Sequence, residues 1–160
     1  MLVSGAGGGI GQALVAELMA RGAAKVYAAA RDVAAVEPLV RQFGERVVAV
    51  PLDVTDNAAV ARAAERCRDR DILINNAGFN QNMWLLGPTG MEAARAEIEV
   101  NYLGTLAMCR AFAPVLTPRQ GMIVANKEEI FPDPMSQQVH DQLCADAKAV
   151  EHQYATMIPR

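Results

Sequence analysis

The feature that most constrains the fold is a regular alternation of short apolar segments with segments of helical periodicity. The apolar segments have the length and content of strands and cover residues 1–4, 25–30, 46–54, 71–78 and 121–126. Segments with apolar side chains at helical spacing lie between them, at residues 10–22, 33–44, 55–69 and 90–118. Strands that alternate with helices form right-handed βαβ units around a parallel sheet. We therefore predict an α/β, doubly wound parallel sheet with strand order 3-2-1-4-5.

The ends of the helices carry recognisable signals. Gly22 and Gly44 predict the ends of the first two helices, and Thr55 with Asp56 predicts a cap at the start of the third. Pro114 is expected to distort the end of the long helix over residues 90–118.

The alternation stops after Asn126, where a helical pattern replaces it. Val139 and Leu143 share one expected helix face, and a second apolar stripe is formed by Val150, Tyr154, Met157 and Ile158. Such stripes are typical of packing faces rather than of ligand sites. We expect the sheet domain to cover residues 1–126 and a helical C-terminal tail of the same domain to cover residues 127–160.

Composition excludes several classes of function. The 160 residues carry a net charge of -3 without a basic stripe, which argues against a nucleic-acid partner. No apolar run approaches the ~20 residues that span a membrane. The start lacks the basic and apolar regions of a signal peptide, so we expect a cytoplasmic protein. The 3 cysteines form no CxxC pair and are expected to be reduced, and no metal site is expected.

A glycine-rich segment, "SGAGGGIGQ", lies between the first strand and the first helix. Gly5 permits a tight turn, Gly9 lets the backbone approach a pyrophosphate, and Gly11 allows close helix–strand packing. The N-terminus of the helix offers backbone N–H groups and a positive dipole end to the phosphates. A plain flexible turn is the alternative, but the strand–loop–helix context favours a phosphate-binding loop.

The residue expected to bind the ribose lies ~20 positions further on, at the end of the second strand. The sequence there is "AAARD", in which Arg31 can pair with a 2′-phosphate and Asp32 can accept from a 2′-hydroxyl. A solvated ion pair on a loop is the alternative. Because Arg31 comes first and a guanidinium suits a phosphate, we predict NADP rather than NAD as the cofactor.

At this point the chain resembles the short-chain dehydrogenase/reductase family over residues 1 to about 125. "SGAGGGIG" is similar to its TGxxxGIG loop, with Ser4 in place of the usual Thr. "LDVTD" resembles the segment that contacts the adenine, "NNAG" a motif that steadies the sheet and lines the cofactor site, and "VNYLGT" a helix that carries a catalytic Asn. The four motifs occur in order and at proper spacing.

The resemblance implies a set of site residues, which adds to those predicted from the glycine loop and the second strand. Asn101 corresponds to the catalytic Asn that holds a proton-relay water. The cofactor-binding residues predicted in this way are Ser4, Gly5, Gly9, Ile10, Gly11, Arg31, Asp32, Asp53, Val54, Asn75, Ala77 and Gly78. The family transfers hydride between a nicotinamide and a carbonyl or alcohol.

The family's other catalytic groups are a Ser after the fifth strand and a Tyr-x-x-x-Lys pair on the next helix. Here Lys127 and two glutamates follow "VAN", and "CADAK" from Cys144 to Lys148 has the spacing with Cys in the Tyr position. None of the three tyrosines has a Lys four residues later. The site has either decayed, or the segment that carries it is missing and the chain continues directly into a family C-terminal tail; we prefer the second interpretation.

Three functions follow from the resemblance. The chain is an oxidoreductase by descent that acts on a small carbonyl or alcohol substrate, a catalytically inactive NADP-binding module, or an interaction partner of full-length homologues. The segment from Glu92 to Leu116 resembles the helix that family members use for subunit pairing. Together with the uncovered edge of the fifth strand, it predicts self-association into a homo-oligomer.

Overall fold

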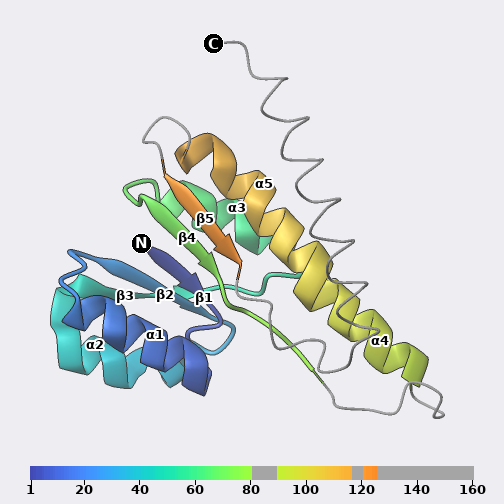
Figure 1. Ribbon diagram of the computed structural model, residues 1–160, viewed down its shortest axis with the longest axis horizontal. Coiled ribbons are helices and arrows are strands. Elements are labelled where there is room, and N and C mark those ends of the chain that lie inside the picture. The colour runs from blue at the N-terminus through green and yellow to red at the C-terminus, as the bar shows by residue number, and fades with distance from the viewer. Residues whose placement is uncertain (81–89, 117–120, 126–160) are drawn as a thin grey trace. The chain divides into compact units, whose positions relative to one another are not determined.

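The computed structural model describes residues 1–80, 90–116 and 121–125, and the following account concerns those residues. All of them fall in one compact unit, Met1–Lys127. Five strands form one sheet: β1 (Leu2–Ser4), β2 (Val26–Ala30), β3 (Val47–Pro51), β4 (Ile72–Asn75) and β5 (Met122–Ala125). The strands are parallel and their order is β3-β2-β1-β4-β5, so the predicted fold class and strand order are confirmed (Figure 1).

Helices connect the strands at the predicted places. They are α1 (Gly9–Ala20), α2 (Glu37–Phe43), α3 (Asn57–Arg66), α4 (Gly90–Ile98) and α5 (Thr105–Leu116). Two short 3₁₀ helices, η1 (Val33–Val36) and η2 (Gly44–Arg46), flank α2. Gly22 and Gly44 follow α1 and α2 with positive φ angles of 89° and 61°, which confirms the predicted helix ends.

The cap of α3 differs in part from the prediction. The Asp56 carboxylate accepts hydrogen bonds from the backbone N–H groups of Ala58 and Ala59, at 2.8 and 3.1 Å, so Asp56 caps the helix as expected. The Thr55 hydroxyl instead donates to Asp53 at 2.8 Å. Thr55 therefore belongs to the loop after β3 rather than to the cap.

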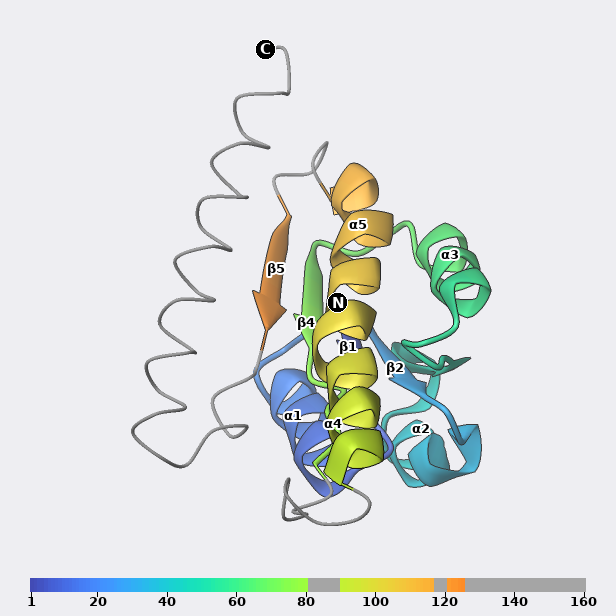
Figure 2. The same ribbon diagram turned by 90° about the vertical axis from the view of Figure 1, so that its right-hand side faces the viewer.

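Two hydrophobic cores lie on opposite faces of the sheet, because successive strand residues point to opposite sides. Leu2 and Leu73 face α3 and α5, whereas Val3 and Ile74 face α1 and α2. Figure 2 shows the helices covering the two faces. Since the central strands β1 and β2 are buried on both faces, they contain almost only apolar residues.

The prediction of one long helix over residues 90–118 was wrong in one respect. A π-helical segment, η3 (Glu99–Gly104), separates α4 from α5. Both an α-helix and a π-turn are helical and can carry apolar side chains at three- and four-residue spacing, so the residue pattern alone did not distinguish them. Pro114 lies within α5, and the described helix continues for two residues beyond it, to Leu116.

The strand β5 differs from the other strands in its burial. It pairs with β4 in parallel register, from Ile72 opposite Met122 to Asn75 opposite Ala125. All four of its residues are exposed, including Met122 at 53%. The predicted C-terminal helices lie outside the described residues.

Candidate functional site

Three glycines shape the loop between β1 and α1 in different ways. Gly5 has a φ of 66°, and a Cβ there would lie 2.8 Å from the Cα of Ala77. A Cβ on Gly11 would lie only 2.2 Å from the carbonyl oxygen of Gly5, so only glycine fits at both positions. Around a Cβ on Gly9 nothing lies within 4 Å, so the backbone there is open to an approaching ligand.

The N-terminus of α1 is built to receive an anion. Its N-cap is Gly8, no side chain caps it, and no acidic residue lies in its first turn. The side chain of Ile10 in that turn is 55% exposed. First-turn N–H groups have no partner within an α-helix, and the helix dipole adds positive potential. The loop and helix together therefore form the type of site that binds a phosphate.

A buried clasp fixes the glycine loop to the end of β4. The Ser4 hydroxyl, 1% exposed, accepts hydrogen bonds from the N–H groups of Asn76 and Ala77, both at 3.0 Å. The Asn76 side chain donates in return to the carbonyl of Ser4 at 3.0 Å and to that of Gly5 at 3.4 Å. The clasp brings the "NNAG" segment against the glycine loop.

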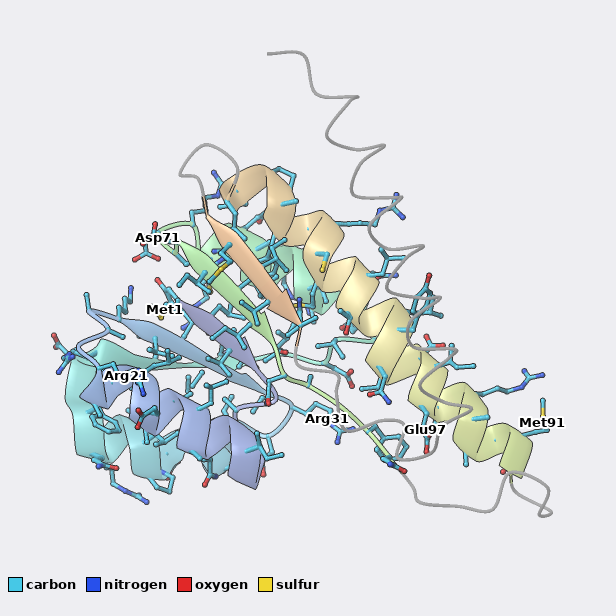
Figure 3. The ribbon with its side chains drawn as sticks, in the orientation of Figure 1. Met1, Arg21, Arg31, Asp71, Met91 and Glu97 are labelled. Carbon is cyan, nitrogen blue, oxygen red and sulfur yellow. The ribbon has the colours of Figure 1, made fainter. Side chains whose placement is uncertain are left out.

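Arg31 follows β2 directly and is exposed. Figure 3 shows it at the carboxyl end of the strands, opposite Met1 and Asp71 at their amino end. Asp32, also exposed, caps the 3₁₀ helix η1, because its Oδ1 accepts from the N–H of Ala34 at 2.9 Å. Both residues lie at the end of the sheet that carries the glycine loop.

The loop after β3 contributes Asp53 and Val54. The Asp53 carboxylate accepts from the backbone N–H of Thr55 at 3.0 Å and from its hydroxyl. These two bonds lower the pKa of Asp53 against the opposing effect of burial, and the positive charge of Arg31 lowers it further. Val54 is buried and packs against Gly104. A Cβ added to Gly104 would lie 2.7 Å from the Cγ2 atom of Val54.

Asn101 lies in the π-helical segment and fastens it to the chain after β4. Its Oδ1 accepts from the N–H of Phe79 at 2.8 Å, and its Nδ2 donates to the Phe79 carbonyl at 2.7 Å. A Cβ on Gly78 would lie 3.5 Å from the same Oδ1. Asn75, 2% exposed at the end of β4, donates to the Cys109 sulfur at 3.5 Å.

The predicted site residues therefore gather at the carboxyl ends of the parallel strands, the end of an open α/β sheet at which ligands bind. Two further residues hold this region together and were absent from the predicted set, Asn76 and Gln12. Asn76 stands within the "NNAG" motif, which was a usable signal. The Gln12 side chain donates hydrogen bonds to the carbonyls of Gly7 and Ala35, and the sequence around Gln12 gives no sign of these contacts.

The positions "KEE" and "CADAK", on which the question of catalysis depends, lie outside the described residues. Within the described ranges, no group of three or more His, Cys, Asp or Glu side chains gathers as metal ligands would. None of the helices among residues 1–80, 90–116 and 121–125 is long and apolar enough to cross a membrane.

Comparison with known proteins gives consistent matches. The chain is similar to a 1-deoxy-11-beta-hydroxypentalenate dehydrogenase of Streptomyces arenae, with 38% identity over 74% of this chain and 44% of that protein. It is 31% identical to an NADP-dependent 3-hydroxy acid dehydrogenase of Salmonella typhi, over 82% of this chain and 52% of that protein. A short chain dehydrogenase from Burkholderia cenocepacia, solved in complex with NADP, matches with 47% identity and a TM-score of 0.72.

The match to that solved structure covers 78% of this chain and 51% of the other chain. This chain therefore spans about half the length of the proteins that it matches. The family model described as short chain dehydrogenase matches residues 1–126. This match covers the whole described region, from the glycine loop through the clasp and Asn101 to β5. The chain belongs to the short-chain dehydrogenase/reductase family of oxidoreductases.

Proposed function

We propose that residues 1–126 form an NADP(H)-binding domain, with residues 127–160 as its helical tail. The observation that carries the proposal is the position of Arg31, beside the glycine loop and at the carboxyl end of β2. Two of the matched proteins are named for NADP, one as dependent on it and one as solved in complex with it.

Different residues of the site suit different parts of the cofactor. Gly9 and the exposed first turn of α1 would receive the pyrophosphate, because nothing lies within 4 Å of a Cβ on Gly9. Arg31 would pair with the 2′-phosphate, and Asp53 with Val54 would contact the adenine. The remaining residues would line or support the site: Ser4, Gly5, Ile10, Gly11, Asp32, Asn75, Ala77 and Gly78.

The oxidoreductase chemistry is a separate part of the proposal. When bound, a reduced nicotinamide would supply a hydride to a carbonyl substrate, and an oxidised one would accept a hydride from an alcohol. Asn101 is the proposed catalytic residue of the described region. General acid–base catalysis also needs a proton donor near the reacting oxygen. The only lysine among the described residues is Lys25, which bonds to Tyr27 and Asp69 rather than to any residue of the cofactor site.

An inactive NADP-binding module is therefore the second candidate function. It is favoured by the sequence, in which no tyrosine is followed by Lys four positions later. We expect the purified chain to bind NADPH and to leave it unoxidised with a panel of aldehydes and ketones. Oxidation above the background rate would show that the chain itself is an active oxidoreductase.

Cofactor preference provides the test of the binding proposal. A guanidinium–phosphate contact contributes ~1.5–3 kcal/mol, so Arg31→Ala should lower the preference for NADPH over NADH about 10- to 100-fold. The matched control is Arg21→Ala. Arg21 is an exposed arginine just after the C-terminus of α1, away from the glycine loop, and it pairs with Glu17. Fluorescence titration measures both affinities. An unchanged preference in Arg31→Ala would refute the proposal.

A homo-oligomer and a cytoplasmic location complete the proposal. Large apolar side chains are exposed along the α4–η3–α5 segment, which resembles the helix that the family uses for subunit pairing: Met91, Ile98, Tyr102, Leu103 and Leu106. Exposed apolar surface of this kind favours association. Light scattering over a range of protein concentrations tests the association.

The low number of cysteines and their wide spacing suit a reducing compartment, as expected of the proposed cytoplasmic location.

A further inference from the structure

Gln12, on the first turns of α1, connects two segments that are far apart in sequence. Its Nε2 donates to the carbonyl of Gly7 at 3.2 Å and to the carbonyl of Ala35 at 2.9 Å. Both acceptors are backbone oxygens, so the side-chain nitrogen, with its two N–H groups, must be the atom that faces them. One side chain therefore ties the glycine loop to the 3₁₀ helix η1.

The two segments also pack directly against each other. A Cβ on Gly7 would lie 3.2 Å from the Cβ of Ala35 and 3.3 Å from the Cβ of Ala30. Contacts of this length are tighter than ordinary van der Waals contact, so even one added methyl group would require these neighbours to move. The distance between the glycine loop and the end of β2 thus depends on small residues on both sides and on the bridge from Gln12.

The turn that follows Arg31 is held at three points. Asp32 accepts from the N–H of Ala34 at its start, and Val36 is 0% exposed in the core at its end. Gln12 holds the carbonyl of Ala35 between them. Arg31 precedes this turn directly and is itself exposed, so the position of its backbone is set by these fixed neighbours.

We infer that Gln12 is a positioning residue for cofactor selection, which holds the Arg31 turn at a fixed distance from the phosphate-binding glycine loop. The inference rests on the proposed function. A dinucleotide contacts the loop through its pyrophosphate and Arg31 through its 2′-phosphate, so the two contacts can form together only if their separation is correct. Preorganised contacts avoid the entropic cost of ordering a loop on binding. Loss of the bridge should therefore weaken the binding of NADPH more than that of NADH.

The test replaces Gln12 by Met, which keeps the length of the side chain and removes both donors. The same substitution at Gln42, an exposed residue of α2, is the matched control. We expect Gln12→Met to lower the ratio of NADPH to NADH affinity about two- to tenfold, the effect of one or two lost hydrogen bonds. Gln42→Met should leave the ratio unchanged. An equal loss for both cofactors, or no loss, would overturn the inference.

A double-mutant cycle tests whether Gln12 acts through Arg31. In an Arg31→Ala background, Gln12→Met should no longer change the ratio, because the group that it positions is gone. A change of ratio as large as in the wild-type background would refute this route. If Arg31→Ala alone leaves the ratio unchanged, the proposed function fails; if only Gln12→Met leaves it unchanged, the positioning role alone fails.

A second variant keeps the inference testable if Gln12→Met folds poorly. Gly7→Ala retains Gln12 and pushes apart the same two segments through the close contacts with Ala30 and Ala35. It should lower the same affinity ratio. A ratio equal to that of the wild type would contradict the claim that the separation of these segments sets selectivity.

Discussion

The two ends of the sheet are held together by different chemistry. At the amino end, three ionisable side chains bond to one another: Lys25 donates to the Tyr27 hydroxyl at 2.6 Å and to Asp69 at 3.1 Å, and Tyr27 donates to Asp69 at 2.6 Å. At the carboxyl end, the clasp of Ser4 and Asn76 uses neutral groups and backbone amides.

The difference bears on where a ligand can bind. At the amino end, the charges of Lys25 and Asp69 offset each other in an ion pair. At the carboxyl end the neutral clasp holds the backbone in place, and the exposed first turn of α1 with Arg31 presents positive potential. A dianionic or more highly charged dinucleotide is therefore expected at the carboxyl end alone.

The largest effect is expected from Gly11→Ala. Its Cβ would lie 2.2 Å from the Gly5 carbonyl oxygen and 2.8 Å from the Cα of Ala6, both of them backbone atoms that cannot rotate away. We expect a loss of about 3 kcal/mol or more in the free energy of unfolding, at the upper end of overpacking effects, together with loss of NADPH binding. Urea denaturation measures the first and fluorescence titration the second.

Gly9→Ala is the control for this substitution, since no atom lies within 4 Å of its Cβ. Alanine favours a helix over glycine by up to about 1 kcal/mol, so the fold should be as stable as the wild type or slightly more stable. NADPH binding should nevertheless weaken, because the methyl group occupies the side that faces the ligand. Equal stability of the Gly9 and Gly11 variants would contradict the packing described for this loop.

An intermediate effect is expected from Ser4→Ala. The substitution removes the Ser4 hydroxyl, which accepts from the partly buried N–H groups of Asn76 and Ala77, and loss of these two hydrogen bonds should cost about 1–3 kcal/mol in the free energy of unfolding. Ser4→Thr keeps the hydroxyl and restores the residue usual in the family motif, so it should retain most of the stability. If Ser4→Ala were as stable as Ser4→Thr, the clasp would not hold the two loops together.

The smallest effect belongs to the amino end. The hydrogen bond from Tyr27, and then that from Lys25, lowers the pKa of Asp69 below its ordinary value of 3.8, despite some burial. A lowered carboxyl pKa stabilises the fold above the unfolded-state pKa, and the contribution is lost as the pH falls through the folded-state value. Because Asp69 is half exposed, Asp69→Asn should cost only about 0.5–1 kcal/mol at pH 7.

Two measurements check this prediction. The difference in unfolding free energy between the wild type and Asp69→Asn should shrink as the pH falls below about 3.8 and disappear once the pH is below the lower folded-state pKa of Asp69. The affinity for NADPH at neutral pH should stay at the wild-type value. A loss of NADPH binding in Asp69→Asn would mean that the two ends of the sheet are not separate in function.

The sequence was sufficient for the elements that depend on local patterns. Short apolar segments and helical spacing predicted the strands and the helices, and their alternation predicted the strand order; the positive φ angles at Gly22 and Gly44 agree with the predicted helix ends. The π-helical segment was missed because helical spacing in the sequence does not tell a π-turn from an α-turn. Thr55 was assigned to the cap with Asp56 because both residue types cap helices, and only the fold shows which one does.

In the candidate site, too, local sequence patterns predicted some features, whereas others depend on tertiary structure. Its motifs located the glycine loop and Arg31, but not the side chains that join them. Gln12 bonds to Ala35 and Asn76 bonds to Ser4 across intervals of 23 and 72 residues, and such pairs form only once the strands are in order. The predicted cofactor contacts of all the site residues remain predictions; the described hydrogen bonds of Asp32 and Ser4 are to the protein itself.

Mapping NADPH binding by NMR on the wild-type chain is the most direct test of the central claim, that the cofactor binds at the carboxyl end of the sheet. We predict that the backbone amide signals of the glycine loop, of Arg31 and of the loop after β3 shift on titration with NADPH. Those of Lys25, Tyr27 and Asp69 should stay in place. Shifts centred on these three residues, or the absence of any saturable shift, would contradict the account.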